Sequence, residues 1–291
     1  MKTAKLAKSY RVDNGKHFRL KDFDPADTGH WHSVDEAKEQ LQKDIKRMEE
    51  LQAMLYAQDR WSLLLIFQAL DAAGKDGTIK HVMSGVNPEG CQVHSFKAPS
   101  DTELQHDFLW RTTRHLPERG HIGIFNRSYY EELLVVRVHP KVLEGELLPP
   151  SLVTKDIWKE RFEDIHAFER HMARNGTVIR KFFLHLSKKE QKKRFLARLD
   201  EPEKHWKFSE ADIHEREYWD DYQDAFEDTI RHTSSKHAPW YVVPADNKWY
   251  THLVVAAAIV ETLEDLKLSY PKVDAAKLKE IAAARKLLSG K

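Results

Sequence analysis

Two hydrophobic patterns alternate along the chain, and the first predicts helices. Between residues 33 and 58, apolar side chains recur three or four positions apart among charged residues. This spacing places them on one face of an α-helix, and Ser33 followed by Glu36 is a capping box that favours a helix start. The apolar positions are Leu41, Ile45, Met48, Leu51 and Leu55. An amphipathic helix is therefore expected ahead of the core.

The second pattern consists of five short, almost continuously apolar runs, separated by helical patterns. They are 61–67, 91–96, 121–125, 178–186 and 240–243. Such runs are typical of parallel strands that are buried on both faces. Strands alternating with helices predict an α/β protein, here a three-layer α/β/α fold with about five parallel strands. In such sheets ligands bind beyond the carboxyl ends of the strands.

The first apolar run leads directly into a small-residue loop and a helical pattern. Phosphates are bound by unobstructed backbone N–H groups at a helix N-terminus, with a lysine to hold a transferring oxygen, and Gly74, Lys75 and Gly77 lie at this junction. The strict P-loop pattern is missed twice, because Ala69 stands at its first glycine and Asp76 at its hydroxyl residue. The strand context still favours a phosphate site over a helix N-cap with a solvated lysine.

Asp71 lies inside the same loop. A carboxylate beside bound phosphate repels it unless a cation intervenes, so Asp71 is interpreted as a Mg²⁺ ligand, a proton acceptor for the attacking phosphate, or both. Mn²⁺ is considered as a substitute for Mg²⁺. No zinc site is expected, since no paired Cys or carboxylate accompanies histidines such as His30 and His166 at ligand spacing.

Composition limits the class of protein. Of the 291 residues, 41% are hydrophobic, enough for a substantial core. Lys and Arg number 47 against 46 Asp and Glu, for a formal net charge of +1, which argues against nucleic-acid binding as the main activity. The single cysteine, Cys91, excludes an internal disulfide. With no signal-like start and no apolar run near the roughly 20 residues that span a bilayer, a cytoplasmic protein without a membrane anchor is expected.

The segment from Leu70 to Lys80 resembles the Walker A motif of the family-2 polyphosphate kinases. The likeness continues through 85–90, 107–111, 123–131 and 135–138, and an ordered series of motifs is far more specific than any single one. The resemblance implies a P-loop kinase core with a helical lid, Mg²⁺, and reversible phosphoryl transfer between inorganic polyphosphate and nucleotides.

The resemblance also assigns residues. Asn126 and Arg127 fall where the family has its Walker B pair, commonly an aspartate and an arginine. The asparagine resembles the branch that has Asn-Arg-Ser and a further glutamate, Glu131 here, and that phosphorylates both AMP and ADP. Adenine nucleotides, with guanine nucleotides as further candidates, are the expected acceptors at Glu131. Because Asn126 supplies no charge, Mg²⁺ binding is expected to shift to Asp71 and the ligand phosphates.

Residues expected to act on the phosphates are basic or lie in the loop. Beside the catalytic set Asp71, Lys75, Asn126 and Arg127, they are Ala73, Gly74, Asp76, Gly77, Thr78, Lys80, Arg137, Arg194, Arg198, Lys204 and Lys207. Arg127 follows a strand, where a guanidinium can grip two phosphate oxygens. For Arg137 an internal salt bridge is nearly as favoured. Arg194 and Arg198 share one helix face in a predicted lid, about residues 188 to 230.

Two segments admit two interpretations each. Arg111, Arg114 and His115 either line a phosphate path or belong to a solvated helix face. An aromatic cluster in the lid is interpreted as core packing rather than as a platform for bases, because of its helical spacing. Its members are Trp206, Phe208, Tyr218, Trp219, Tyr222 and Phe226.

A single catalytic domain, 31–265, is expected between a polar N-terminal extension, 1–30, and a C-terminal helix, 266–291. The resemblance implies a homo-oligomer formed through the terminal helices, although the apolar residues at 263, 266 and 268 could equally fold back on their own domain. An ATP-dependent kinase, with 246–248 holding the base, is the alternative enzyme. A non-catalytic nucleotide-binding module or a single-stranded nucleic-acid binder is disfavoured by the intact loop and the near-neutral charge.

Overall fold

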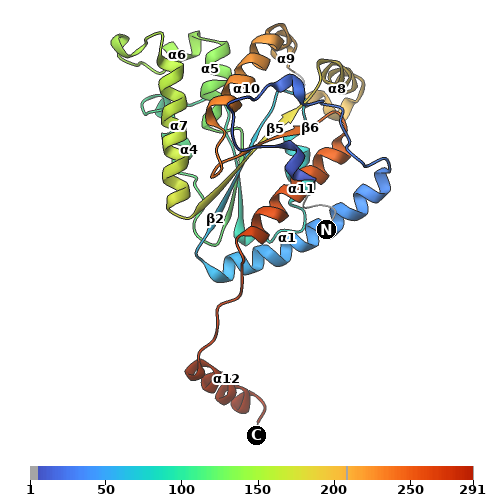
Figure 1. Ribbon diagram of the computed structural model, residues 1–291, viewed down its shortest axis with the longest axis vertical. Helices are drawn as coiled ribbons and strands as arrows, with labels where there is room; N and C mark the ends of the chain where they lie inside the picture. The colour runs from blue at the N-terminus through green and yellow to red at the C-terminus, as the bar shows by residue number, and fades with distance from the viewer. Residues whose placement is uncertain (1–5, 208, 291) are drawn as a thin grey trace.

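The computed structural model describes residues 6–207 and 209–290, apart from the side chains of Lys204 and Lys207 (Figure 1). Its centre is one sheet with the strand order β1-β6-β5-β2-β4-β3. The parallel strands are β2 (Ser62–Gln68), β3 (Cys91–Ser95), β4 (Ile122–Asn126), β5 (Thr177–His185) and β6 (Trp240–Pro244). All five predicted strands are thereby confirmed, with ends shifted by no more than one residue.

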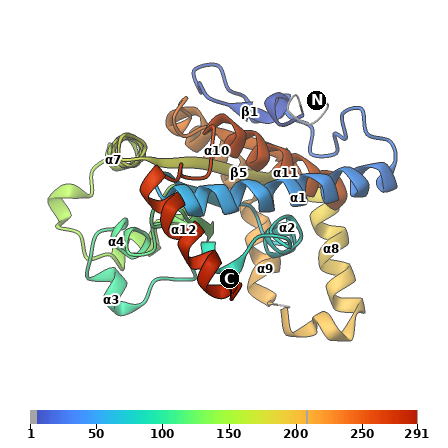
Figure 2. The same ribbon diagram turned by 90° about the horizontal axis from the view of Figure 1, so that it is seen from below.

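Helices cover both faces of this sheet (Figures 1 and 2). The helices on one face are α1 (Val34–Gln58), α2 (Lys75–Val82) and α11 (Lys248–Asp265), and those on the other are α7 (Ile157–Arg174) and α10 (Trp219–Thr233). Side chains of β2 alternate between the two hydrophobic clusters, with Leu63 and Leu65 on the α1 side and Leu64 and Ile66 on the α7 side. The predicted three-layer arrangement is confirmed, and the predicted cap at Ser33 accepts the N–H of Glu36 at 3.3 Å.

The remaining elements are helices, most of them short. They are η1 (Ala7–Tyr10), η2 (Leu20–Asp22), η3 (Pro88–Gly90), α3 (Asp101–Leu104), α4 (Trp110–Thr113), η4 (Tyr129–Leu133), α5 (Val135–Val138), α6 (Lys141–Glu144), η5 (Pro150–Leu152), α8 (Lys188–Asp200), η6 (Pro202–Lys207), α9 (Glu210–His214), η7 (Glu215–Tyr218) and α12 (Ala275–Leu288). Within the described ranges, no helix combines the length and apolar character needed to cross a bilayer.

The N-terminal extension, which is polar in composition, packs apolar side chains into the core. β1 (Arg11–Val12), which the sequence did not predict, pairs antiparallel with β6 at the sheet edge. A two-residue strand is too short to show a period, which explains the omission. Phe18 and Leu20 are buried in the α7-side cluster, and the Tyr10 hydroxyl lies 2.7 Å from that of Tyr250 on α11. The extension is therefore docked on the catalytic core.

The C-terminal region divides at the end of α11. Leu263 is fully buried, and Leu266 and Leu268 pack against the α1-side cluster, so these three residues fold back on their own domain. Beyond them α12 stands apart from the body (Figure 1), with all of its residues exposed. The predicted C-terminal helix is present, but it begins at Ala275 rather than near residue 266.

A buried ion pair ties η4 to the core. Lys181 on β5 and Glu169 on α7 are both inaccessible to solvent, with 2.6 Å between Nζ and Oε2. Nζ also donates to the Tyr130 hydroxyl at 2.9 Å and to a backbone carbonyl, while Glu169 Oε1 accepts from the hydroxyls of Tyr129 and Tyr130 at 2.9 and 2.7 Å. Burial lowers the pKa of Lys181. The network fixes the segment that directly follows Arg127.

Replacing Glu169 by alanine is expected to lower the free energy of unfolding by about 3–5 kcal/mol, because the Lys181 ammonium would remain buried without its charge partner. Denaturant titration of both proteins measures the difference. The double variant Glu169→Leu with Lys181→Met removes both charges and should lose less. A single variant that costs no more than the double one would contradict this account.

Candidate active site

The loop between β2 and α2 is shaped to receive phosphate. Ala72 and Gly74 adopt left-handed φ values of 64° and 100°, which turn the chain sharply into the N-terminus of α2. At Gly77 no atom lies within 4 Å of the position a Cβ would take, so a ligand can approach the backbone there. Left-handed backbone is costly for alanine. Ala72 must therefore be held by contacts from outside the loop.

Helix α8 supplies those contacts. Gln191 donates to the carbonyl of Asp71 at 3.0 Å, and Arg194 donates to the carbonyls of Ala72 and Ala73 at 3.1 and 2.8 Å. Arg194 also binds the carbonyls of residues 245 and 246 and the Glu190 carboxylate, so all five of its N–H donors are used. The N–H of Ala73 bonds the carbonyl of Leu70 at 3.3 Å. Because α8 holds the carbonyls of residues 71 and 73, the N–H groups of Ala72 and Gly74 in the same peptide units point away from α8 and can bind anions.

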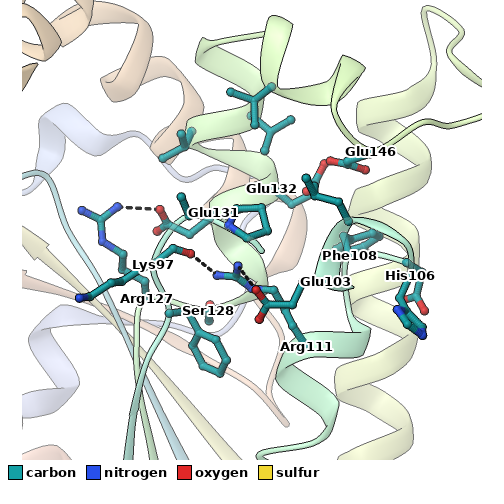
Figure 3. A pocket seen from close by; sticks show the side chains of 18 residues that line it. Lys97, Glu103, His106, Phe108, Arg111, Arg127, Ser128, Glu131, Glu132 and Glu146 are labelled. Carbon is teal, nitrogen blue, oxygen red and sulfur yellow. Dashed lines mark hydrogen bonds and ion pairs between the residues drawn. The ribbon is translucent and has the colours of Figure 1, made fainter. Parts of the chain in front are cut away.

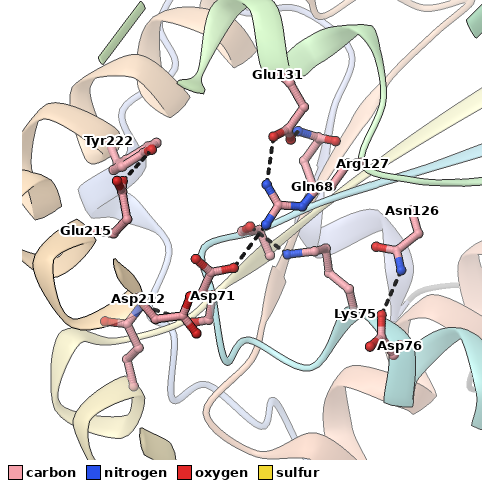
Figure 4. Close-up of polar contacts among 12 residues, drawn as sticks. Gln68, Asp71, Lys75, Asp76, Asn126, Arg127, Glu131, Asp212, Glu215 and Tyr222 are labelled. Carbon is pink, nitrogen blue, oxygen red and sulfur yellow. Dashed lines mark hydrogen bonds and ion pairs between the residues drawn. The ribbon is translucent and has the colours of Figure 1, made fainter. Parts of the chain in front are cut away.

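A charged network surrounds Lys75 (Figure 4). The Arg127 guanidinium lies between two carboxylates, 3.1 Å from Asp71 Oδ1 and 2.8 Å from Glu131 Oε2. Glu131 also accepts from Gln68 at 2.8 Å, and Lys75 Nζ donates to the carbonyl of Ala69 at 2.9 Å. Arg127 itself has a left-handed φ of 63°, and its N–H bonds the carbonyl at the end of β2. Four predicted site residues thus meet in one place: Asp71, Lys75, Arg127 and Glu131.

The charges in this network shift two pKa values in opposite directions. Attraction to Glu131, and less strongly to Asp71, raises the pKa of Arg127 against its own burial. Burial lowers the pKa of Lys75, and repulsion from Arg127 lowers it further. Bound phosphate would oppose both effects on Lys75, the burial and the repulsion from Arg127, since its negative charge favours the ammonium form of the lysine.

Asn126 and Asp76 form a second polar pair at the mouth of the loop. Asn126 Nδ2 donates to Asp76 Oδ1 at 2.7 Å, which leaves the amide oxygen of Asn126 as an acceptor. The sequence predicts Asp76 as a phosphate-binding residue, but a carboxylate at the hydroxyl position of the motif is chemically a cation ligand. Asp71 and Asp76 lie on opposite sides of Lys75 (Figure 4). Both carboxylates therefore enter the question of the metal.

A cleft of about 610 Å³ opens over the loop and is lined by residues 71–77, Asn126 and Arg127. Basic side chains extend it in several directions: Lys97, Arg194, Arg198, Lys248 and the histidines at 81 and 252. Sequence reasoning missed Lys97 and His252, which lie in the β3–α3 loop and on α11 and belong to no short motif. Arg198 pairs with Asp212 of α9 at 3.4 Å, which joins the two arms of the predicted lid.

A second pocket, of about 450 Å³, adjoins the cleft and is mainly apolar (Figure 3). Arg127, Ser128 and Glu131 line it on the side toward the phosphate loop. Its apolar lining comprises Phe96, Ala98, Pro99, Leu104, Phe108, Val135, Val136 and Val142. Arg111, left open between two interpretations, lines this pocket and donates to the carbonyl of Lys97 at 2.7 Å. The sequence signal for this pocket lay in the segments 107–111 and 135–138.

Some predicted phosphate ligands lie elsewhere. Arg137 lines neither cavity; its Nη2 pairs with Asp228 of α10 at 2.7 Å, so the internal salt bridge replaces the predicted phosphate contact, because a helix carboxylate lies within its reach. Thr78 is buried, and Lys80 is exposed outside both pockets. The side chains of Lys204 and Lys207 are outside the part of the chain that the structure describes.

The predicted aromatic cluster is core packing only in part. Trp219, Tyr222 and Phe226 of α10 are buried as predicted. Trp206 is 78% exposed and Tyr218 is 40% exposed, so the prediction was wrong for them. Both precede α10 and do not share its inward face. Phe208 lies outside the described residues.

The strand, loop and helix, the lysine and the adjoining arginine define a phosphotransferase site on a P-loop kinase fold. A family model for polyphosphate kinase 2 matches residues 31–271, and the chain belongs to the polyphosphate kinase 2 family. It is 55% identical over 282 residues to an ADP-polyphosphate phosphotransferase of Rhodopseudomonas palustris, covering 94% of this chain and 98% of the relative. An AMP/ADP-polyphosphate phosphotransferase of Meiothermus ruber is 46% identical, with 92% and 97% covered.

A solved structure agrees with this assignment. Polyphosphate kinase 2 from Arthrobacter aurescens superposes with a TM-score of 0.89 at 40% identity, and the alignment covers 98% of this chain and 97% of that one. The family resemblance and the fold predicted from the sequence are both confirmed.

The grip of α8 on the loop predicts an effect of Gln191→Leu. The variant loses the bond to the Asp71 carbonyl and also the bond that the Gln191 side-chain oxygen accepts from Arg216. The bond to the loop alone contributes about 1 kcal/mol, so the KM for the phosphoryl donor should rise at least about fivefold. Steady-state kinetics test this, with Lys192→Ala, an exposed neighbour on the same helix, as the matched control. An unchanged KM in the leucine variant would show that the loop keeps its shape without α8.

Proposed function

We propose that this protein is a polyphosphate-dependent nucleotide kinase, which transfers phosphoryl groups reversibly between inorganic polyphosphate and AMP or ADP. The observation that carries the proposal is the pair of adjoining cavities that share Arg127. One is a basic cleft over the phosphate loop, suited to a polyanion, and the other is an apolar pocket of nucleoside size. The names of the relatives at 55% and 46% identity support both substrates.

The transfer is an in-line displacement without a covalent enzyme intermediate. A phosphate oxygen of AMP or ADP attacks the terminal phosphorus of polyphosphate, the bridging P–O bond breaks, and the polymer leaves one phosphate shorter. Such reactions depend on positioning and on stabilisation of charge at the transferring group. Lys75 and the loop N–H groups hold the donor phosphates, and Arg127 faces the transferring group from between the two cavities. Glu131 holds Arg127 in place, and Arg198 extends the cleft for the polymer.

Oxygen ligands for Mg²⁺ are present on both sides of Lys75. Mg²⁺ is bound by carboxylates together with substrate phosphates and water, and Asp71 and Asp76 offer carboxylate oxygens at the cleft, with the amide oxygen of Asn126 beside them. The donor set fits this ion, and Mn²⁺ prefers the same ligand type. When bound, the ion would neutralise charge on the donor phosphates. We assign Asp71 as the main ligand and Asp76 as a second one.

Three further properties complete the proposal. Guanine nucleotides are expected as slower acceptors. A homo-oligomer is supported by α12, because its apolar residues Leu278, Ile281 and Leu288 are 50–90% exposed in a single copy of the protein. A reducing cytoplasm is supported by the single cysteine in 291 residues.

The decisive assay combines the purified protein with Mg²⁺, long-chain polyphosphate and AMP, ADP or GDP in turn, and resolves the products by chromatography. ADP formed from AMP, and ATP from ADP, only in the presence of polyphosphate, is the expected result. Turnover of small acceptors with ATP but never with polyphosphate would move the assignment to a conventional kinase.

Lys75→Ala is expected to fold normally and to lose activity by about 10³-fold or more, because the lysine contacts the reacting phosphates in the proposed geometry. Circular dichroism and thermal unfolding verify the fold, and the chromatographic assay measures the rate. Lys192→Ala serves again as the control for removal of a positive charge. A folded Lys75→Ala protein with undiminished turnover is incompatible with the proposed role.

A further inference from the structure

The far end of the apolar pocket carries a charged group that the transfer chemistry leaves unused. Figure 3 places Arg127 and Lys97 at one end of the pocket, and Phe108, Glu132 and Glu146 at the other. A nucleotide whose phosphates lie at the Arg127 end extends its base toward the second end. Neither glutamate was singled out by sequence reasoning, because Glu132 has the spacing of an ordinary helix residue and Glu146 lies in a loop.

Both glutamates are held from behind by one arginine. Arg161 of α7 is 4% exposed and lies 2.6 Å from Glu132 Oε1 and 2.8 Å from Glu146 Oε2. Its guanidinium also lies over the ring of Phe108, 4.7 Å from the ring centre. Arg161 does not itself line the pocket. It therefore orients three pocket-lining side chains, one aromatic and two acidic, without contacting a ligand.

The hydrogen bonding of this group is incomplete in the protein alone. Glu132 is 7% exposed, and its Oε1 has no aligned hydrogen-bond partner among the described residues despite the short contact with Arg161. A buried carboxyl oxygen without an aligned donor is costly. Its neighbour Glu146 keeps partial access to the pocket, with 13% of its side chain exposed. Glu132 Oε1 is thus turned toward Arg161, and Glu146 is the carboxylate more open to a ligand that enters between Phe108 and the valines.

We propose that Glu132 and Glu146 form hydrogen bonds with the base of the acceptor nucleotide and favour adenine through its 6-amino group. This proposal rests on the proposed function. Phe108 offers the flat apolar surface on which a purine stacks. A site built to hydrogen-bond a substrate N–H rejects the analogue that lacks it, because its own polar groups are then left unpaired. Glu146, the more accessible of the two, accepts the amino N–H.

The protonation of the pair supports the same assignment. Burial raises the pKa of Glu132 to about 8, against the attraction of Arg161 and with a further upward contribution from Glu146. The shift favours the neutral form of Glu132, whose O–H can donate to a base nitrogen, while a carboxyl oxygen of Glu146 accepts a base N–H. Adenine presents the complementary arrangement, an acceptor at N1 beside the donor at N6. Hypoxanthine and guanine present the opposite arrangement, an N1–H donor beside an O6 acceptor.

The test measures binding of nucleotides in the absence of polyphosphate, so that it does not depend on turnover. Calorimetry compares AMP with purine riboside 5′-monophosphate, which lacks only the amino group, and with IMP. Wild-type protein should bind AMP at least about tenfold more tightly than either analogue. In Glu146→Gln, which keeps an oxygen for Arg161, the preference should fall to about twofold, with little change for the analogue that lacks the amino group.

Glu144→Gln, an exposed carboxylate on α6, is the matched control and should keep the wild-type preference. Glu132→Gln provides a second variant at the site and should also reduce the preference. Equal affinity of wild-type protein for AMP and the purine analogue, or a preference that survives in both site variants, would overturn base reading by this pair. Polyphosphate turnover, measured separately on the same proteins, shows whether the proposed function stands independently of that outcome.

Discussion

The ion pairs of Arg127 with Asp71 and Glu131 are the interaction on which the site depends. They join the phosphate loop to η4 and the end of β4, and Arg127 lies 56 residues beyond Asp71 along the chain. The guanidinium lines both cavities, so in the proposed mechanism a single charged group faces the donor and the acceptor phosphates at once. A carboxylate on either side fixes its position before any ligand binds, and the charge need not be reorganised during transfer.

This arrangement requires a rigid backbone, which the second layer of contacts supplies. From one side α8 holds the carbonyls of residues 71–73, and from the other Lys181 and Glu169 hold the tyrosines of η4. The positive φ values of Ala72 and Arg127 are sustained by these contacts. Strained backbone at a functional site persists where the surroundings over-determine it. Arg194 is in this respect a support of the loop, and its predicted contact with the transferring group stays a prediction.

Local signals in the sequence were sufficient for the five parallel strands, for α1 with its cap at Ser33, and for the loop around Lys75, because each follows from a short pattern. They were insufficient wherever a partner lies far along the chain. Arg137 could not be separated from a phosphate ligand without knowledge of Asp228, which is 91 residues away. The pocket that contains Glu146 is assembled from residues 96–146 by the fold alone, and no periodicity marks its members as neighbours.

The separate position of α12 has a consequence for how the protein behaves at different concentrations. This helix buries no side chain against its own chain, and an isolated helix of about 12–15 residues is only marginally stable in water. In a single copy of the protein, tertiary packing therefore adds little to the stability of α12. If its apolar residues pack on a second copy, helix formation and association become a single equilibrium, and the helical content of the tail reports how much of the protein is assembled.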